Sequence, residues 1–379
     1  MDYLLTEEQI MIRDMVAKFA KEEIAPVASD NEKNGTFPSE IIKKAGELGL
    51  MGVGYPAEYG GAGMDYVSYM IAVEEISKAC ASTGVIVSAH SSLSVDPIFS
   101  FGTEEQKQKY LPEMCSGKWI GCHALTEPGA GSDAGALNTT AKLVGDKWVL
   151  NGTKHFITNG AEANVCVLFA STDLSAKTKG ISAFIVEKDT PGFKIGKLEH
   201  KLGIRATSTA ELIFEDCAIP KENILGEQGK GFKIALMTLD GGRLGIASQA
   251  LGIAKASIED AIKFAKEREQ FNQAISNFQA IQWMIADMYT EYEAAWLLVY
   301  RASIMKDKGI RYTKEAAMAK LKASEVASFC ASKAVQIHGG YGYTDEFNVE
   351  RYLRDAKITE IYEGTSEIMR LVISANLLK

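Results

Sequence analysis

The chain has 379 residues, a length that suggests two or three domains rather than a single core. Its hydrophobic fraction of 46% and charged fraction of 24% are typical of a globular protein. The net charge is −8 and no run of five Lys or Arg occurs, which argues against nucleic-acid binding. No apolar stretch of about 18 residues is present, so we expect no membrane span.

The six cysteines and five histidines show no metal-binding spacing, because neither C-x-x-C nor H-E-x-x-H occurs. Scattered cysteines in a chain of this size are typical of free core thiols in a reducing compartment. We therefore predict that the protein has no metal site and is cytoplasmic.

The first part of the chain shows helical patterns. Thr6 and Gln9 predict a capping box, and Ile12, Val16 and Phe19 then share one helical face. Further helices are expected over residues 39–48, 67–78 and 104–114. We predict an N-terminal helical domain over residues 1–118.

From residue 119 onward the pattern changes to strands. Runs rich in β-branched and aromatic residues predict strands over residues 165–170, 181–186 and 210–214. The pairs Asn151-Gly152 and Asn159-Gly160 stand next to apolar runs, which predicts hairpin turns. We predict a compact central β-domain, barrel-like or sandwich-like, over residues 119–230.

The rest of the chain is helical in character. Long helical stretches over residues 244–267, 280–306 and 314–337, with one last helix, predict a four-helix bundle over residues 231–379. The fold class is therefore predicted to be α+β.

A glycine-rich segment joins the first helices to the strands. Gly129, Gly131 and Gly135 free the backbone to present N–H groups to an anion or a flat ring, and Thr126 and Ser132 add hydroxyl groups. The glycine spacing is neither that of a dinucleotide fingerprint nor that of a P-loop. A plain turn between domains is the alternative interpretation.

Two further segments could hold a heterocycle or a phosphate. Phe156 and Thr158 could flank a flat ring, although on this motif alone a core Phe and a structural Thr are the default reading. Residues 336–340 end a helix on a glycine pair, which either opens the backbone to a ligand or caps the helix. Arg268 and Gln279 flank another helix break, and each could bind a phosphate or lie on the surface.

The segment Tyr362-Glu363-Gly364 carries the strongest chemical indication. A carboxylate beside a glycine opening becomes a stronger base if it is desolvated. The alternative is a glycine-capped helix end with solvated acids. Asp240 and Arg243 are expected on one face at a helix start, where a structural ion pair is the default reading.

Together these motifs resemble the acyl-CoA dehydrogenase family, over the whole chain and most closely its short-chain, butyryl-CoA branch. The stretches that carry the resemblance are Leu-Thr-Glu-Pro-x-x-Gly-Ser-Asp at 125–133, Phe-Ile-Thr-Asn-Gly at 156–160 and Tyr-Glu-Gly-Thr-Ser-Glu at 362–367. The resemblance implies an N-terminal helical domain, a central β-domain, a C-terminal four-helix bundle, and a homotetramer built as a dimer of dimers.

The resemblance also implies FAD as the cofactor and assigns residues to it. The flavin and its ribityl–pyrophosphate chain would be held by Leu125, Thr126, Glu127, Ser132, Phe156, Ile157 and Thr158. The ADP half would be held by Arg268, Gln279, Gln336, Ile337, His338, Gly339 and Gly340, partly from a neighbouring subunit. Thr365, Ser366 and Glu367 would meet the flavin past the catalytic turn. The acyl-CoA would be contacted by Ser132, Asp240, Gly241, Arg243 and Gly364.

The implied reaction makes Glu363 the catalytic base. Glu363 would remove the α-proton of the thioester while a hydride leaves the β-carbon for flavin N5, giving the trans-2-enoyl-CoA. Developing enolate charge would be stabilised by the peptide N–H of Glu363 and a flavin ribityl hydroxyl. Electrons would pass to electron-transferring flavoprotein. The alternatives are an enoyl-CoA reductase working in reverse in an anaerobe and an inactive flavoprotein scaffold.

Two details refine this expectation. Relatives that carry the base on the bundle helix place it just before the channel arginine, where this chain has Gly242, so Glu363 is expected to be the only base. Residues 82–93 contain no Lys or Arg to pair with a second carboxylate, so an uncharged acyl chain is expected. His90 and His123 could be core histidines or could tune substrate shape.

Overall fold

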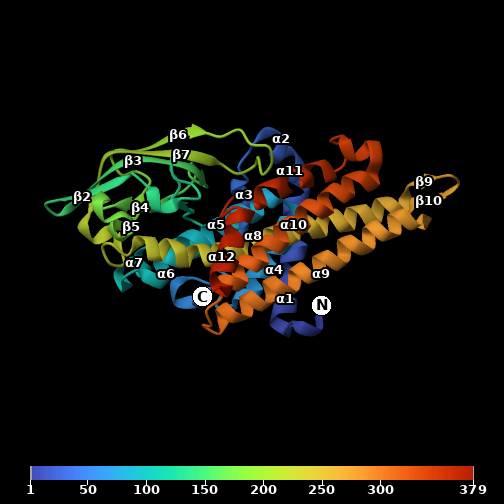
Figure 1. Ribbon diagram of the computed structural model, residues 1–379, viewed down its shortest axis with the longest axis horizontal. Helices are drawn as coiled ribbons and strands as arrows, with labels where there is room; N and C mark the ends of the chain where they lie inside the picture. The colour runs from blue at the N-terminus through green and yellow to red at the C-terminus, as the bar shows by residue number, and fades with distance from the viewer. Residues whose placement is uncertain (1, 379) are drawn as a thin grey trace.

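The computed structural model describes residues 2–378, so the outer limits of the predicted first and last domains, residues 1 and 379, lie outside the described part. The chain forms an N-terminal helical region, a central sheet and a C-terminal helical region, which confirms the predicted fold class (Figure 1). None of the described helices combines the length and apolar character that a membrane crossing needs.

The N-terminal region has seven α-helices among its described residues, and Thr6 and Gln9 form the predicted capping box at the first of them. The helices are α1 (Glu7–Phe19), α2 (Ala25–Asn34), α3 (Ser39–Glu47), α4 (Tyr66–Ala79), α5 (Ala81–His90), α6 (Asp96–Phe101) and α7 (Glu104–Cys115). Every residue of α5 is buried, so the helix shows no polar face and its sequence carries no helical period.

The central region is a mixed sheet with the order β6-β7-β3-β2-β4-β5-β8, and β1 pairs with β4. Its strands are β1 (Gly121–Ala124), β2 (Thr140–Val144), β3 (Lys147–Thr158), β4 (Val165–Ser171), β5 (Ile181–Glu187), β6 (Phe193–Leu198), β7 (Thr209–Pro220) and β8 (Ile224–Leu225). Strand β4 is buried on both faces: Val167 and Phe169 join one core, and Cys166 and Leu168 join the other.

The hairpin predictions were wrong at both Asn-Gly pairs. Asn151-Gly152 lies inside β3, at a register shift against β7, where a Cβ on Gly152 would lie 2.5 Å from Oγ1 of Thr139. The glycine therefore serves a bulge with close packing rather than a turn. Asn159 ends β3 with a φ of 62°, but the next strand, β4, does not pair with β3.

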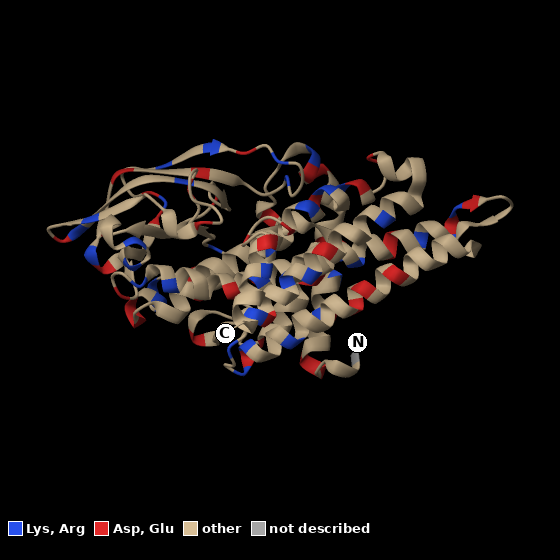
Figure 2. Cartoon of the chain, viewed as in Figure 1, with Lys and Arg blue, Asp and Glu red and all other residues tan. Residues whose placement is uncertain are grey.

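The C-terminal region is built on three long helices, α8 (Gly231–Glu267), α9 (Gln279–Asp307) and α10 (Thr313–His338). Two shorter helices, α11 (Val349–Thr359) and α12 (Ser366–Leu377), pack on α10. Figure 1 shows α8 running from beside the sheet to the β9 (Glu269–Gln270) and β10 (Gln273–Ala274) hairpin at the other end. In Figure 2, acidic and basic residues are interspersed along these helices.

Helix α8 begins earlier than expected, so Asp240 and Arg243 lie well inside it rather than at its start. The Gly241-Gly242 pair does not interrupt the helix, because both residues are buried between neighbouring elements. Helix α4 packs on α8 so closely that a Cβ on Gly252 would lie 2.5 Å from the carbonyl oxygen of Glu74. This packing joins the N-terminal helices to the bundle.

Candidate active site

The segment between α11 and α12 turns sharply at Glu363 and Gly364. Both residues have left-handed backbones, with φ of 52° and 98°. A left-handed φ in a residue with a side chain costs on the order of 1–3 kcal/mol and persists only when its surroundings hold it. Thr365 then caps α12, its hydroxyl accepting from the N–H of Ile368. The predicted turn therefore exists and is strained at the predicted base.

The carboxylate of Glu363 reaches the surface of α8. Glu363 as a whole is half-buried, but its Oε2 is fully buried and has no hydrogen-bond partner among the described residues. A Cβ on Gly242 would lie 2.0 Å from this Oε2 and 2.6 Å from Cδ2 of Leu93. The carboxylate thus lies against Gly242, where α8 carries no side chain, with the apolar Leu93 beside it. It is not the solvated helix end of the alternative interpretation.

Burial controls the charge state of this carboxylate. Burial raises the pKa of Glu363 to about 8, and the positive charges of Lys320 and Arg243 act in the opposite direction. Burial likewise lowers the pKa of Lys320 to about 8. A carboxylate with such a pKa can hold or release a proton near neutral pH, as a general base must.

The two predicted substrate residues on α8 form an ion pair. Nη1 of Arg243 donates to Oδ1 of Asp240 at 2.6 Å, and Thr313 of α10 donates to the other oxygen at 2.7 Å. The carbonyl of Gly241 accepts a hydrogen bond from the hydroxyl of Tyr66 at 2.8 Å. Gly242, which faces Glu363, lies between Gly241 and Arg243 on α8. The ion pair and the Gly241 carbonyl therefore lie within one helical turn of the Glu363 carboxylate's contact with α8.

The predicted flavin-binding loop after β1 is organised from within by a buried lysine. Nζ of Lys154 donates to the carbonyl of Leu125 at 2.9 Å and to Oε1 of Glu127 at 2.8 Å. Glu127 also accepts from the backbone N–H groups of Asn138 and Thr139. The side chain of Glu127 is therefore engaged inside the protein, whereas Ser132 is exposed.

The three predicted flavin contacts on strand β3 divide between the core and the surface. Phe156 is 60% exposed and has a φ of 58°, so its ring is available to a ligand. Ile157 is buried in the core of the sheet, and Thr158 is half-buried. Of the three predicted residues, Phe156 and Thr158 thus present side chains outward and Ile157 does not.

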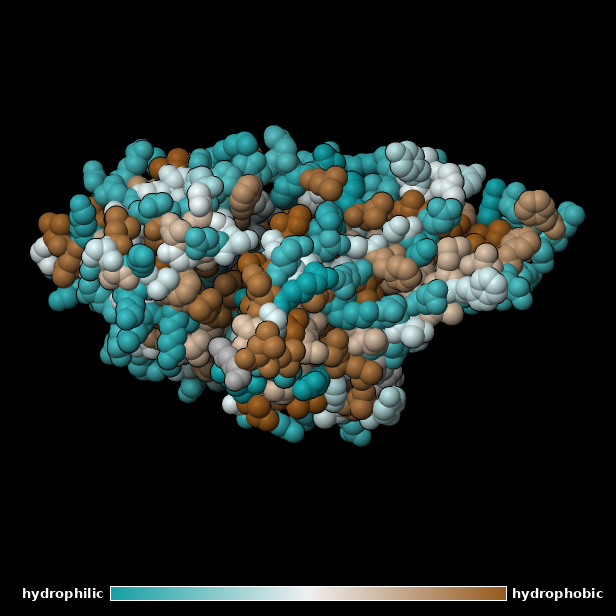
Figure 3. All heavy atoms as spheres, viewed as in Figure 1, coloured by the Kyte–Doolittle hydropathy of each residue, from teal (hydrophilic) through white to brown (hydrophobic). Residues whose placement is uncertain are grey.

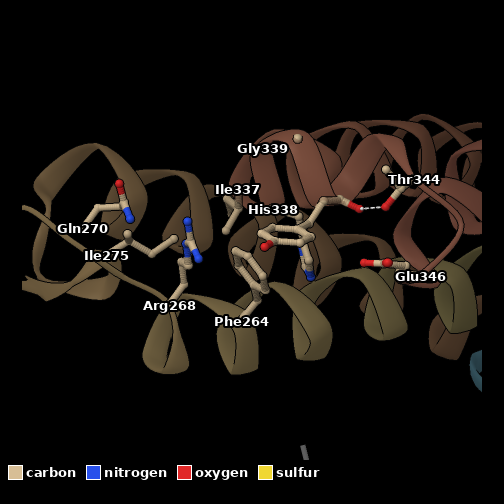
Figure 4. A pocket seen from close by; sticks show the side chains of 11 residues that line it. Phe264, Arg268, Gln270, Ile275, Ile337, His338, Gly339, Thr344 and Glu346 are labelled. Carbon is tan, nitrogen blue, oxygen red and sulfur yellow. Dashed lines mark hydrogen bonds between the residues drawn. The ribbon is translucent and has the colours of Figure 1, made fainter.

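A second group of predicted residues lines a cavity of about 640 Å³ at the far end of α8 (Figure 4). Its lining includes the predicted Arg268, Ile337, His338, Gly339 and Gly340. Residues that the sequence analysis did not identify there are Phe264, Gln270, Ile275, Tyr341, Thr344 and Glu346. The predicted Gln279 and Gln336 are exposed and do not line this cavity.

Two further predicted flavin contacts follow the Glu363–Gly364 turn. Ser366 is buried there and Glu367 is exposed.

Both histidines of uncertain role are neutral and hydrogen-bonded. Burial lowers the pKa of His90 to about 4, and its two ring nitrogens bond the carbonyl of Met114 and the N–H of Gly121. Burial also lowers the pKa of His123 to about 4, and its Nδ1 donates to the carbonyl of Leu93 at 3.0 Å. His90 is a core histidine, whereas His123 holds the backbone of Leu93, the residue that lies beside the Glu363 carboxylate.

Comparisons with known proteins match all three regions. The N-terminal, middle and C-terminal domain models of acyl-CoA dehydrogenase match residues 6–118, 122–217 and 229–378. A short-chain specific acyl-CoA dehydrogenase of Clostridium acetobutylicum is 55% identical over the full length of both chains. The acryloyl-CoA reductase (NADH) of Anaerotignum propionicum is 51% identical over all of this chain and 96% of its own.

Two solved structures agree closely with this one. A chain in the structure reported for the electron transferring flavoprotein of Acidaminococcus fermentans, in work on flavin-based electron bifurcation, is 55% identical with a TM-score of 0.99. Butyryl-CoA dehydrogenase from Megasphaera elsdenii is 46% identical with a TM-score of 0.98. Both cover 100% of each chain. The chain belongs to the acyl-CoA dehydrogenase family.

Proposed function

We propose that this protein catalyses the α,β-dehydrogenation of a short-chain acyl-CoA thioester to the trans-2-enoyl-CoA, with Glu363 as the base. The observation that carries the proposal is the buried, unpartnered Oε2 of Glu363 facing Gly242. An oxygen with no internal partner is free to accept the α-proton of a substrate held against α8. Leu93 is an apolar neighbour of the carboxylate, and burial of the carboxylate keeps it basic.

FAD is the cofactor in this proposal, and the residues present fit it. A Cβ on Gly129, Gly131 or Gly340 would meet nothing within 4 Å, so the backbone is open where a ligand must approach. Arg268 adds a cation to the 640 Å³ cavity beside Gly339 and Gly340. When bound, the flavin supplies the acceptor for the substrate hydride. The loop held by Lys154 and the outward-facing Phe156 would bind its ring.

We infer a homotetramer in which flavin sites are shared between subunits. Arg268 directly follows α8, a helix of 37 residues, and lies about 39 Å along it from Gly242. That separation supports an arrangement in which the cavity of one subunit serves the base of another. Figure 3 shows apolar side chains gathered over the region of α12, where Leu371, Leu377 and Leu378 are exposed, as expected of a subunit interface.

Two domain limits remain predictions, one between residues 118 and 119 and the other between residues 230 and 231. The cytoplasmic location also remains a prediction. The limits are supported by the end of α7 at Cys115, the start of β1 at Gly121 and the start of α8 at Gly231.

The substrate is proposed to be short and uncharged. Leu93 lies beside the Glu363 carboxylate, and residues 82–93 are buried and contain no Lys or Arg. A second carboxylate on the acyl chain would be left unpaired there, at a cost of several kcal/mol. The short-chain and butyryl-CoA relatives support the same substrate class.

Electron-transferring flavoprotein is the proposed electron partner, supported by the structure that shares 55% identity with this chain. A second candidate function is enoyl-CoA reduction in the reverse direction, which the relative named acryloyl-CoA reductase favours. The same residues serve both directions. The inactive-scaffold alternative does not account for a buried base with a raised pKa.

Anaerobic titration of the purified protein with acyl-CoAs of increasing length, branching and terminal charge tests the proposal. We expect butyryl-CoA to bleach the flavin absorbance and glutaryl-CoA to leave it unchanged. Absence of a flavin band, or bleaching by glutaryl-CoA alone, would overturn the cofactor or the substrate class. The two directions are separated by two rates. One is the rate at which butyryl-CoA reduces the flavin, and the other is the rate at which crotonyl-CoA reoxidises the flavin of the pre-reduced protein.

A further inference from the structure

A buried lysine lies directly beneath the turn that carries Glu363. Lys320 lies on α10, its side chain is fully buried, and its Nζ donates to the carbonyl of Gly364 at 2.7 Å. Among the described residues this is the only hydrogen bond found for the ammonium group. We propose that Lys320 is a positioning residue for the reaction, because it fixes the Glu363–Gly364 turn against the bundle. The proposal rests on the assignment of Glu363 as the base.

The residue on the other side of Glu363 is also tied down. The hydroxyl of Tyr362 donates to Oε1 of Gln249 on α8, and Nε2 of Gln249 donates to the carbonyl of Ala81 at 2.9 Å. Glu363 is thus held between Tyr362, fixed to α8, and Gly364, fixed to α10. These two anchors maintain a left-handed φ that the chain would otherwise relax.

The stability of the bundle does not explain a lysine at position 320. Burying an ammonium group that bonds only a carbonyl is costly, and a methionine would fill the same space without that cost. The positive charge instead acts on its surroundings. Lys320 faces the carboxylates of Glu363, Glu360 and Glu367 and the guanidinium of Arg243.

The effect of this charge on Glu363 has a defined direction. Lys320 is the larger of the two influences that oppose the raised pKa of Glu363, and Arg243 is the other. Tyr69 and Tyr362 also face Glu363, and each is neutral over the working range because burial raises its pKa. Loss of the lysine charge therefore leaves Glu363 harder to ionise, so the acidic limb of the pH–rate profile moves to higher pH.

The test uses the intact flavin-loaded protein and four substitutions. Lys320→Gln keeps a donor without the charge, Lys320→Met removes both, and Lys320→Arg keeps both. Lys255→Met is the matched control, because Lys255 is a lysine of the same bundle that pairs with Glu75 about 20 Å along α8 from Gly242. The rate of flavin reduction by butyryl-CoA, per bound flavin, is measured from pH 6 to pH 10. An infrared titration of the Glu363 carboxyl band, identified by its loss in Glu363→Gln, gives a readout independent of activity.

We expect Lys320→Gln and Lys320→Met to reduce flavin about 10- to 100-fold more slowly at pH 7, the size of effect that a small displacement of a reacting group produces. Their acidic limb and the infrared midpoint should move to higher pH, while Lys255→Met keeps the wild-type midpoint. Lys320→Arg stays charged where Lys320, with its pKa of about 8, loses its charge, so it should not move the midpoint to higher pH. Wild-type rates and midpoints in Lys320→Gln and Lys320→Met would overturn the proposal. A slower rate that Lys320→Arg does not restore, together with an unshifted midpoint, would also overturn it. So would a midpoint in Lys320→Arg that moves to higher pH. A wild-type rate in Glu363→Gln would instead remove the proposed base, whatever the lysine variants do.

Discussion

Gly242 of α8 and Glu363 of the α11–α12 turn share one space, since a Cβ on Gly242 would lie 2.0 Å from Oε2 of Glu363. Real Cβ atoms do not approach another heavy atom that closely, so the carboxylate can occupy this position only because residue 242 has no side chain. The base on the turn and the absence of a side chain on the helix are therefore two parts of one arrangement.

Replacing Gly242 with alanine should displace the base without removing it. We expect Gly242→Ala to bind flavin but to reduce it with butyryl-CoA about 100-fold more slowly, because a displacement near 1 Å has that effect on a reacting group. Stopped-flow absorbance measures the rate. Gly54→Ala is the control, since a Cβ there meets nothing within 4 Å. Equal rates in the two variants would show that Glu363 does not need the space.

The raised pKa of Glu363 should appear in the stability of the protein. Its folded pKa is about 8 against an ordinary value of 4.5, so between these values the folded state holds a proton that the unfolded state has lost. Stability therefore falls as pH rises through this window. The thermal midpoint of Glu363→Gln relative to wild type should increase from pH 5 to pH 8 and then level off. A difference that does not change with pH would mean that the carboxyl titrates normally.

The buried pair of Lys154 and Glu127 should support the flavin-binding loop. Lys154→Met leaves the Glu127 carboxylate buried without its charged partner, and we expect a loss of about 3 kcal/mol in unfolding free energy together with weaker flavin retention. Denaturant unfolding and the flavin content after gel filtration measure the two effects. Lys142→Met, at an exposed position of β2, is the control and should change neither. Full flavin retention in Lys154→Met would show that the loop does not depend on the pair.

Shared flavin sites predict complementation between two inactive variants. Arg268→Ala should lose flavin from the distal cavity, and Glu363→Gln should lose the base. If the two residues serve one site from different subunits, tetramers assembled from a mixture of both chains contain some sites with both residues intact. Reassembly after mild dissociation should therefore restore part of the activity, whereas Lys266→Ala, an exposed neighbour of Arg268, should be active alone. No recovery in mixed tetramers would place both residues in the same subunit.

Patterns that depend on local chemistry were predictable from the sequence. The capping box at Thr6, the strand that begins at Val165 and the helix end at His338 follow from neighbouring residues, and the structure confirms each of them. The Glu363–Gly364 turn could be predicted as an opening in the backbone, although its contact with Gly242, more than a hundred residues earlier, could not.

The features that the sequence analysis missed depend on tertiary packing. Lys154 and Lys320 resemble solvated lysines within a strand and a helix, and only the fold shows that both are buried. A signal existed for Lys154, because strand alternation places it on the same face as Trp148 and Leu150. Asp240 and Arg243 were expected at a helix start, yet α8 continues through the buried Gly241 and Gly242 although glycine weakens isolated helices.

Anaerobic mixing of flavin-loaded Glu363→Gln with butyryl-CoA tests the central assignment most directly. The amide fills the same space beside Gly242 but cannot accept the α-proton, so we predict normal flavin content, normal acyl-CoA binding and bleaching slowed by at least about 1,000-fold. Bleaching at the wild-type rate would show that another group takes the proton and that Glu363 is not the base.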